Sequence, residues 1–276
     1  MTRFSFQTLG GLQQADLHDG SSMDAPLVVV APAIGIEARF YAGLCAGLAE
    51  VGIGAVSIDM PGHGASPIRA GRHADWGYEE LVDHFASAIR ALAEVRPDAP
   101  LYLLGHSLGG HVALMLAGRG DVRATGVVLV ATGAPYWRAW HGPGALFLRW
   151  GSALYGVLAR IMGYFPGHRL GFGGREARTL IAQWAASART GEYDFPGFMG
   201  EALLGKPGPP VHSIALRGDF FAPEAAIRHM LDKLKQRDVG IETWESAPHG
   251  GNHNRWPSEP GFVVDRVVAF VGEHPR

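Results

Sequence analysis

Cysteine is almost absent from this chain of 276 residues, which contains a single one, Cys45. One cysteine cannot form an intramolecular disulfide, so the hydrophobic core must hold the fold, and a chain of this length can bury a large core. Cys45 lies within an alanine- and leucine-rich helical pattern. This position predicts an inert core thiol rather than a nucleophile.

The chain also has little excess charge. Its formal net charge is -2, and 18% of its residues are charged. No stripe of lysine and arginine runs along the sequence, which argues against nucleic acid as a partner. Hydrophobic residues make up 47% of the chain, so the composition is that of a globular protein and not of a disordered one.

Long apolar segments are missing as well. The first residues, MTRFSFQTLGG, lack the apolar run of a signal peptide, and no segment approaches the length of a membrane span. The sequence therefore predicts a cytoplasmic protein with no membrane span.

Short apolar runs do alternate with helical patterns along most of the chain. After a predicted hairpin over residues 4–9 and 14–18, we expect strands at 27–32, 53–59, 101–104, 126–132, 211–218 and 240–246. Helical patterns cover residues 37–51, 78–95, 223–236 and 260–271, and a further helix begins at Leu108. This alternation predicts an α/β fold with a mostly parallel central sheet flanked by helices.

Residues 134–210 interrupt this alternation with many aromatic residues and glycines. A segment of this length is uncommon as a bare loop, so we expect a helical cap insertion in a core domain made of residues 1–133 and 211–276. Most of its aromatic side chains are expected to fill the cap's own core. Tyr136 and Trp137 follow directly after a predicted strand, and we expect these two to line a substrate pocket.

The motif G-x-S-x-G occupies residues 105–109, between a predicted buried strand and a predicted buried helix. Its glycines leave space for a sharp turn that exposes the serine Oγ at the carboxyl end of the strand, where α/β sheets bind ligands. The adjacent helix N-terminus favours developing negative charge. Ser107 is therefore the predicted nucleophile, and the backbone N–H of Leu108 is a predicted oxyanion donor.

A serine nucleophile needs a base that a third group orients. Asp219 ends a predicted strand, which places it at the same edge of the sheet as Ser107. The loop before the last helix offers two candidate bases, His249 and His253. Their HxxxH spacing also occurs in helical metal sites, but Gly250 and Gly251 make this segment a loop, so we expect neither a metal nor another cofactor.

The order Ser107, Asp219, histidine resembles the triad of the α/β-hydrolase fold family, and the chain is identified as a member over almost its whole length. DMPGHGAS at 59–66 resembles the family's D-x-x-G-x-G-x-S loop, and GDFFAP at 218–223 resembles its acid loop. In many members the catalytic histidine precedes a proline by seven residues. The resemblance therefore implies His253, seven residues before Pro260, as the base and not His249.

A closer likeness is to a group of bacterial predicted serine α/β hydrolases. It rests on RFYAGLCAGLAEVG at 39–52, PYW at 135–137, GYFPGHRLG at 163–171 and QWA at 183–185, and it brings no substrate with it. Many relatives carry His-Gly after the first parallel strand, with an oxyanion-hole amide just beyond. Here Pro32-Ala33 and Ile34-Gly35 stand at that place, and the resemblance implies the Ile34 N–H as the second donor.

These features predict a serine hydrolase that cleaves an ester or thioester of a medium-sized apolar acyl group through an acyl-enzyme intermediate. A peptidase or a lipase is also compatible with them. Dehalogenases and epoxide hydrolases of this fold typically have an aspartate where this chain has Ser107. Two other readings stay open: a non-catalytic protein that binds a small ligand on the same scaffold, and an acyltransferase or lyase that uses the same triad.

Overall fold

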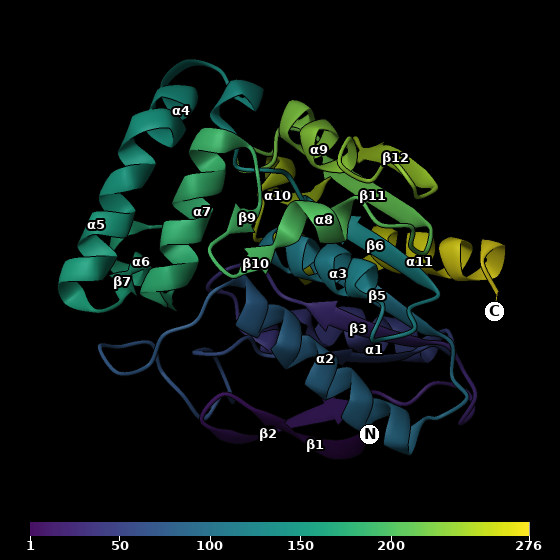
Figure 1. Ribbon diagram of the computed structural model, residues 1–276. Helices are drawn as coiled ribbons and strands as arrows, with labels where there is room; N and C mark the ends of the chain where they lie inside the picture. Colours follow the sequence, from purple (N-terminus) through teal and green to yellow (C-terminus); the bar gives the residue numbers. More distant parts are fainter. Residues whose placement is uncertain (276) are drawn as a thin grey trace.

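The computed structural model describes residues 1–275, in which a central sheet lies between two layers of helices (Figure 1). The sheet has six strands, all parallel, in the order β12-β11-β6-β5-β3-β4. Its strands are β3 (Leu27–Ala31), β4 (Gly54–Ser57), β5 (Leu101–His106), β6 (Gly126–Val130), β11 (Val211–Leu216) and β12 (Val239–Trp244). The predicted α/β-hydrolase fold class is confirmed.

The sheet is covered on both faces, which explains why its central strands are almost wholly apolar. Helices α2 (Tyr78–Val95) and α3 (Leu108–Arg119) lie on one face, and α1 (Ala42–Glu50) and α11 (Gly261–Glu273) lie on the other. Alternate residues of β3 divide between the two hydrophobic clusters, with Val29 on the side of α2 and α3, and Val30 on the side of α1 and α11.

The predicted hairpin is also present, as β1 (Thr2–Thr8) and β2 (Gly11–Leu17), an antiparallel pair below the main sheet in Figure 1. Two predicted helices differ in extent. The first begins as a 3-10 turn (Ala38–Tyr41) before α1, and α9 (Glu224–Leu231) ends before Gln236, because the chain must turn there to enter β12. The remaining short helical elements of the core are α10 (Pro248–Gly251) and a 3-10 turn (Trp256–Ser258).

The chain between β6 and β11 forms an insertion. Its two long helices, α5 (Ser152–Met162) and α7 (Arg178–Thr190), lie side by side, and a π-helical turn (Phe147–Gly151) joins α5 to α4 (Gly142–Leu146). Its shorter elements are a 3-10 turn (Trp137–Ala139), α6 (Gly167–Leu170), α8 (Gly200–Leu204), and the strand pairs β7 (Phe165–Pro166) with β8 (Arg175–Glu176) and β9 (Asp194–Phe195) with β10 (Phe198–Met199). The helices α4, α5 and α7 stand to the left of the sheet in Figure 1, while α8 lies beside α3.

The two ends of the helical part of this insertion meet. Gly191 has a φ of +78°, and a Cβ there would lie 2.9 Å from Cγ of Tyr136, so only glycine allows this approach. His229 donates an Nε2 hydrogen bond of 3.2 Å to the carbonyl of Gly191, which ties the same point to α9. The chain therefore leaves the core and returns to it at one place.

Cys45 is a buried residue of α1, as its helical pattern predicts. Burial raises the pKa of its thiol to about 12, so it stays protonated at neutral pH and is a poor nucleophile. None of the helices in residues 1–275 combines the length and the hydropathy that a membrane span requires.

Candidate active site

Ser107 lies at the sharp turn between β5 and α3, with φ 53° and ψ -119°. A positive φ is strained for a residue with a Cβ, and such strain gathers at functional sites. The turn is possible because its neighbours are small: a Cβ on Gly109 would lie 2.0 Å from the carbonyl oxygen of Ala31. The strand-turn-helix geometry thus presents Ser107 to a cavity at the carboxyl end of the sheet.

His253 and Asp219 form a hydrogen-bonded pair beside this turn. His253 Nδ1 lies 2.7 Å from Asp219 Oδ2, and both residues are buried. The other carboxylate oxygen, Oδ1, accepts the backbone N–H groups of Phe221 (2.8 Å) and Ala222 (3.2 Å). Because an ionised carboxylate only accepts hydrogen bonds, Nδ1 carries the proton and the Nε2 lone pair stays available. His253 lines the same cavity as Ser107.

His249 lies elsewhere. Its side chain is exposed, and its Nε2 is 3.3 Å from Ser258 Oγ and 3.6 Å from a carboxylate oxygen of Glu259. It does not line the cavity in the part of the chain that the structure describes. The structure therefore brings His253, and not His249, to Asp219.

The two predicted oxyanion donors both line the cavity. Leu108 is the first residue of α3, where backbone N–H groups lack intrahelical partners. Ile34 follows β3, and neither its N–H nor that of Leu108 donates to an acceptor within residues 1–275. The neighbouring N–H of Ala33 donates to the hydroxyl of Tyr41 (3.0 Å) and is not free.

Tyr41 joins this loop to the turn that holds Ser107. Its hydroxyl accepts from the N–H of Ala33 and forms a hydrogen bond of 2.7 Å with His106 Nδ1. The ring of His106 lies 4.9 Å from that of His253, centroid to centroid. Burial, and next the nearby His253, hold the pKa of His106 well below its usual range. Sequence reasoning missed this link, because Tyr41 lies 65 residues from His106.

We expect Tyr41→Phe to lower kcat about tenfold with little change in KM for a short ester. The substitution keeps the ring but leaves the buried N–H of Ala33 and Nδ1 of His106 without partners, which costs about 1–3 kcal/mol. Steady-state kinetics and thermal melting measure both effects. Tyr102→Phe is the control, since Tyr102 lies near the amino end of β5, away from Ser107, and its hydroxyl donates to the carbonyl of His274. Equal kinetic losses in the two variants would contradict a positioning role.

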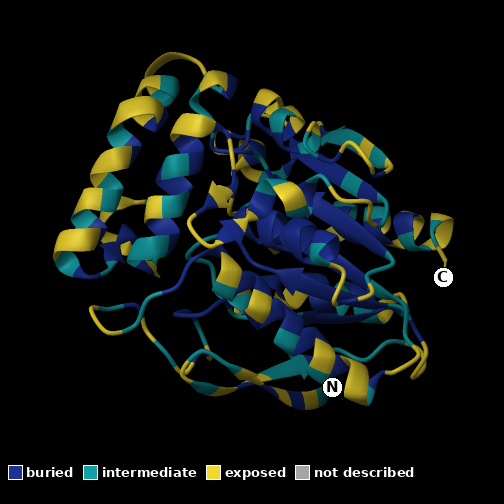
Figure 2. Cartoon of the chain, viewed as in Figure 1, coloured by how far each residue is buried: buried dark blue, intermediate teal, exposed yellow. Residues whose placement is uncertain are grey.

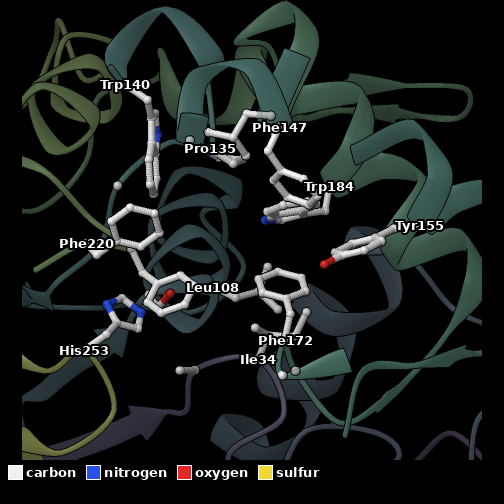
Figure 3. A pocket seen from close by; sticks show the side chains of 18 of the residues that line it. Ile34, Leu108, Pro135, Trp140, Phe147, Tyr155, Phe172, Trp184, Phe220 and His253 are labelled. Atoms are coloured by element: carbon white, nitrogen blue, oxygen red, sulfur yellow. The ribbon is translucent and has the colours of Figure 1, made fainter. Parts of the chain in front are cut away.

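The cavity has a volume of about 410 Å³, which suits a drug-sized ligand. Figure 3 shows its aromatic walls, with His253 at one side and Tyr155 and Trp184 at the other. Apart from Ser107, His111, Tyr155, His253 and Asn254, the lining is apolar or glycine, and none of the lining residues is acidic. The cavity is therefore suited to an uncharged, apolar group.

The expectation that Tyr136 and Trp137 line this cavity is wrong. The ring of Tyr136 packs 4.7 Å from that of His229, at the base of the insertion. Trp137 is covered by the guanidinium of Arg149, 4.4 Å from its ring. The reason is the 3-10 turn after β6, which turns both side chains away and brings Pro135 and Trp140 to the cavity instead.

The insertion is held to the core by a buried ion pair. His63, in the PGHGAS loop, has its Nε2 3.2 Å from Oε2 of Glu176, and the other oxygen of Glu176 accepts the N–H of Gly174 (2.6 Å). Burial opposes protonation of His63, but the attraction of Glu176 outweighs burial. Asp59 adds a smaller contribution that favours protonation and Arg69 one that opposes it, and the pKa of His63 is raised overall. The pair fixes the segment that carries Phe172 into the cavity wall.

This raised pKa predicts a loss of stability as the pH rises above 6.5. The stabilisation is fully present below the unfolded pKa of 6.5 and disappears as pH rises through the higher folded pKa. His63→Gln lacks this pH-dependent stabilisation. The amount by which the Tm of wild type exceeds that of the variant should therefore shrink by about 2–4 °C as the pH rises from below 6.5 to above the folded pKa, which is equivalent to about 1 kcal/mol of stability. Melting curves over a pH series test this, with His249→Gln as the exposed control. A constant difference would show that the pair does not titrate.

A buried six-stranded parallel sheet and a serine at a strained strand-to-helix turn beside an Asp–His pair define the α/β-hydrolase class. A sequence model of the serine aminopeptidase S33 family matches residues 24–175, more than half of the chain, and the chain belongs to this family.

Individual relatives are more distant. A stretch of 92 residues is 34% identical to lipase LipV of Mycobacterium tuberculosis, and this match covers 33% of this chain and 31% of the lipase. A carboxyl esterase from Bacillus coagulans superimposes with a TM-score of 0.70 over 99% of this chain and 98% of the esterase, at 17% identity. A monoacylglycerol lipase from Paleococcus ferrophilus gives 0.64 over 99% and 98%, at 20% identity. These two structures show a shared fold.

Proposed function

We propose that the protein is a serine hydrolase that cleaves an ester or thioester of a medium-sized apolar acyl group through an acyl-enzyme intermediate. One observation carries this proposal: Ser107 and His253 both line the same apolar cavity, and His253 is hydrogen-bonded to Asp219. The lipase and esterase named above, as relatives in sequence or in fold, support an ester as the substrate.

In this mechanism Ser107 Oγ attacks the substrate carbonyl while Nε2 of His253 takes its proton. Asp219 keeps the proton on Nδ1 and stabilises the imidazolium that forms. The N–H groups of Leu108 and Ile34 donate to the oxyanion, and each such hydrogen bond contributes about 3 kcal/mol to the transition state. His253 then returns the proton to the leaving group, and water hydrolyses the acyl-enzyme by the same steps.

The absence of acidic residues from the cavity lining favours an ester over an N-terminal peptide. An aminopeptidase must hold the α-ammonium group of its substrate, and a buried cation requires a paired charge. The apolar walls instead match an acyl chain. We assign residues 134–210 the role of a cap that sets acyl-chain preference, because Trp140, Phe147 and Trp184 of this segment line the cavity.

An active-site probe tests the chemistry directly. A fluorophosphonate should add once to the protein, on Ser107, as measured by intact mass and peptide mapping, and Ser107→Ala should remain unlabelled. A panel of esters, thioesters and aminoacyl anilides then identifies the substrate class. Failure to label wild type would favour the non-catalytic binder, and acyl transfer to an added alcohol in preference to water would favour an acyltransferase.

The cap assignment predicts that chain-length preference depends on Leu148, a buried residue of the cavity wall. Leu148→Trp should fill part of the cavity and lower kcat/KM about tenfold more for octanoyl than for acetyl esters, since the remaining space holds the short acyl group but not the long one. Leu154→Trp is the matched control, because Leu154 lies on the exposed side of α5. Equal losses for both esters in Leu148→Trp would indicate a folding defect.

A further inference from the structure

The outer side of α4, the π-helical turn and α5 carries large apolar side chains that face solvent. We call this set the apolar stripe: Leu146, Trp150, Leu154, Val157 and Ile161, each more than half exposed. Their spacing of three and four places puts them on one side of the helix, and Figure 2 shows the exposed outer side of α5 facing away from the core. A contiguous apolar surface of this kind marks an interaction site.

The apolar stripe continues to the mouth of the cavity. Phe147, next to Leu146, is 39% exposed and also lines the cavity. Figure 3 shows its ring beside Trp184. Leu170 and Phe220 likewise are exposed and line the cavity. A surface that covers the stripe therefore also reaches the cavity entrance.

The charges on the chain segment that carries the stripe are all positive. No aspartate or glutamate occurs from residue 122 to residue 175, although the chain as a whole has a net charge of -2. Arg149 and Arg160 are exposed on the same helical segment, and neither has an ion-pair partner among residues 1–275. A groove between α5 and α7 adds Arg189, which lines it together with Arg160 and with Val157 of the stripe.

We propose that this surface docks on an anionic lipid layer. An amphipathic helix with an apolar side and flanking arginines lies in the plane of such an interface, with its apolar residues among the acyl chains and its arginines near the phosphates. A second copy of the chain fits less well, since a two-fold contact through this surface would bring Arg149 and Arg160 of both copies together with no local carboxylate to offset them. Docking would place the cavity mouth at the lipid, a consequence that rests on the proposed function.

Co-sedimentation with vesicles tests the docking without reference to activity. The full chain should sediment with vesicles of phosphatidylcholine and phosphatidylglycerol and much less with vesicles of phosphatidylcholine alone. Leu154→Ser with Ile161→Ser should reduce the partition coefficient at least tenfold, and Arg160→Gln should reduce it about fivefold. The matched controls Leu12→Ser and Arg123→Gln, exposed residues far from the stripe, should leave it unchanged.

Three outcomes would overturn the proposal: no binding to either vesicle, equal binding to both, or equal losses in stripe and control variants. Light scattering after size-exclusion chromatography tests the alternative that a second copy of the chain covers the stripe. A dimer that the double serine variant dissociates, without vesicle binding, would assign the stripe to a second copy. Hydrolysis of a water-soluble acetyl ester should be the same in all these variants, because none of the changed residues lines the cavity. A uniform absence of hydrolysis with intact vesicle binding would refute the proposed function and leave the docking standing.

Discussion

Ser107→Ala should lower kcat for ester hydrolysis by about a millionfold, the loss typical of a removed serine nucleophile. The Oγ is the only atom lost, and it makes no hydrogen bond within residues 1–275 that the fold needs. Stability should therefore change little. Kinetics with an octanoyl ester and thermal melting measure the two quantities on one preparation.

Ser213→Ala provides the comparison for this variant. Ser213 is a fully buried serine of β11 whose hydroxyl has no partner in the described chain, so its loss should leave both turnover and probe labelling intact. If Ser107→Ala kept more than a few per cent of wild-type activity with contamination excluded, the nucleophile would be another residue.

The second large effect separates the two histidines of the last loop. His253→Ala should abolish turnover and fluorophosphonate labelling at neutral pH, a loss of about a millionfold in kcat, because Ser107 then has no base. His249→Ala should keep most activity and cost about 1 kcal/mol of stability, from its hydrogen bond to Ser258. Circular dichroism of both variants checks that each is folded. The opposite pattern, with His249→Ala inactive, would mean that the loop has another arrangement during catalysis.

The sequence was most informative where local pattern and topology act together. An apolar strand, a glycine-flanked serine and an apolar helix lie within fifteen residues, and parallel topology alone places Asp219 at the same edge of the sheet as Ser107. The spacing to Pro260 singled out His253 from His249, and the structure pairs His253 with Asp219.

The rest depends on packing between distant segments. Tyr136 and Trp137 are close to β6 in sequence, but the direction of their side chains is set by the 3-10 turn and by contacts with His229 and Arg149. The link from Tyr41 to His106 spans 65 residues, and the pair of His63 with Glu176 spans 113. Periodicity within one element contains no information about such partners.

The contact between Tyr136 and Gly191 allows the segment between these two residues to vary in evolution. Because the chain departs and returns at one point, residues 137–190 form a closed excursion whose length can change between two anchor positions, provided that Glu176 keeps its buried contact with His63 of the core. The entropy of closing such an excursion grows only slowly with its length. Under the proposed role of the cap, changes confined to this excursion would alter acyl-chain preference while the sheet and its Asp–His pair stay unaltered.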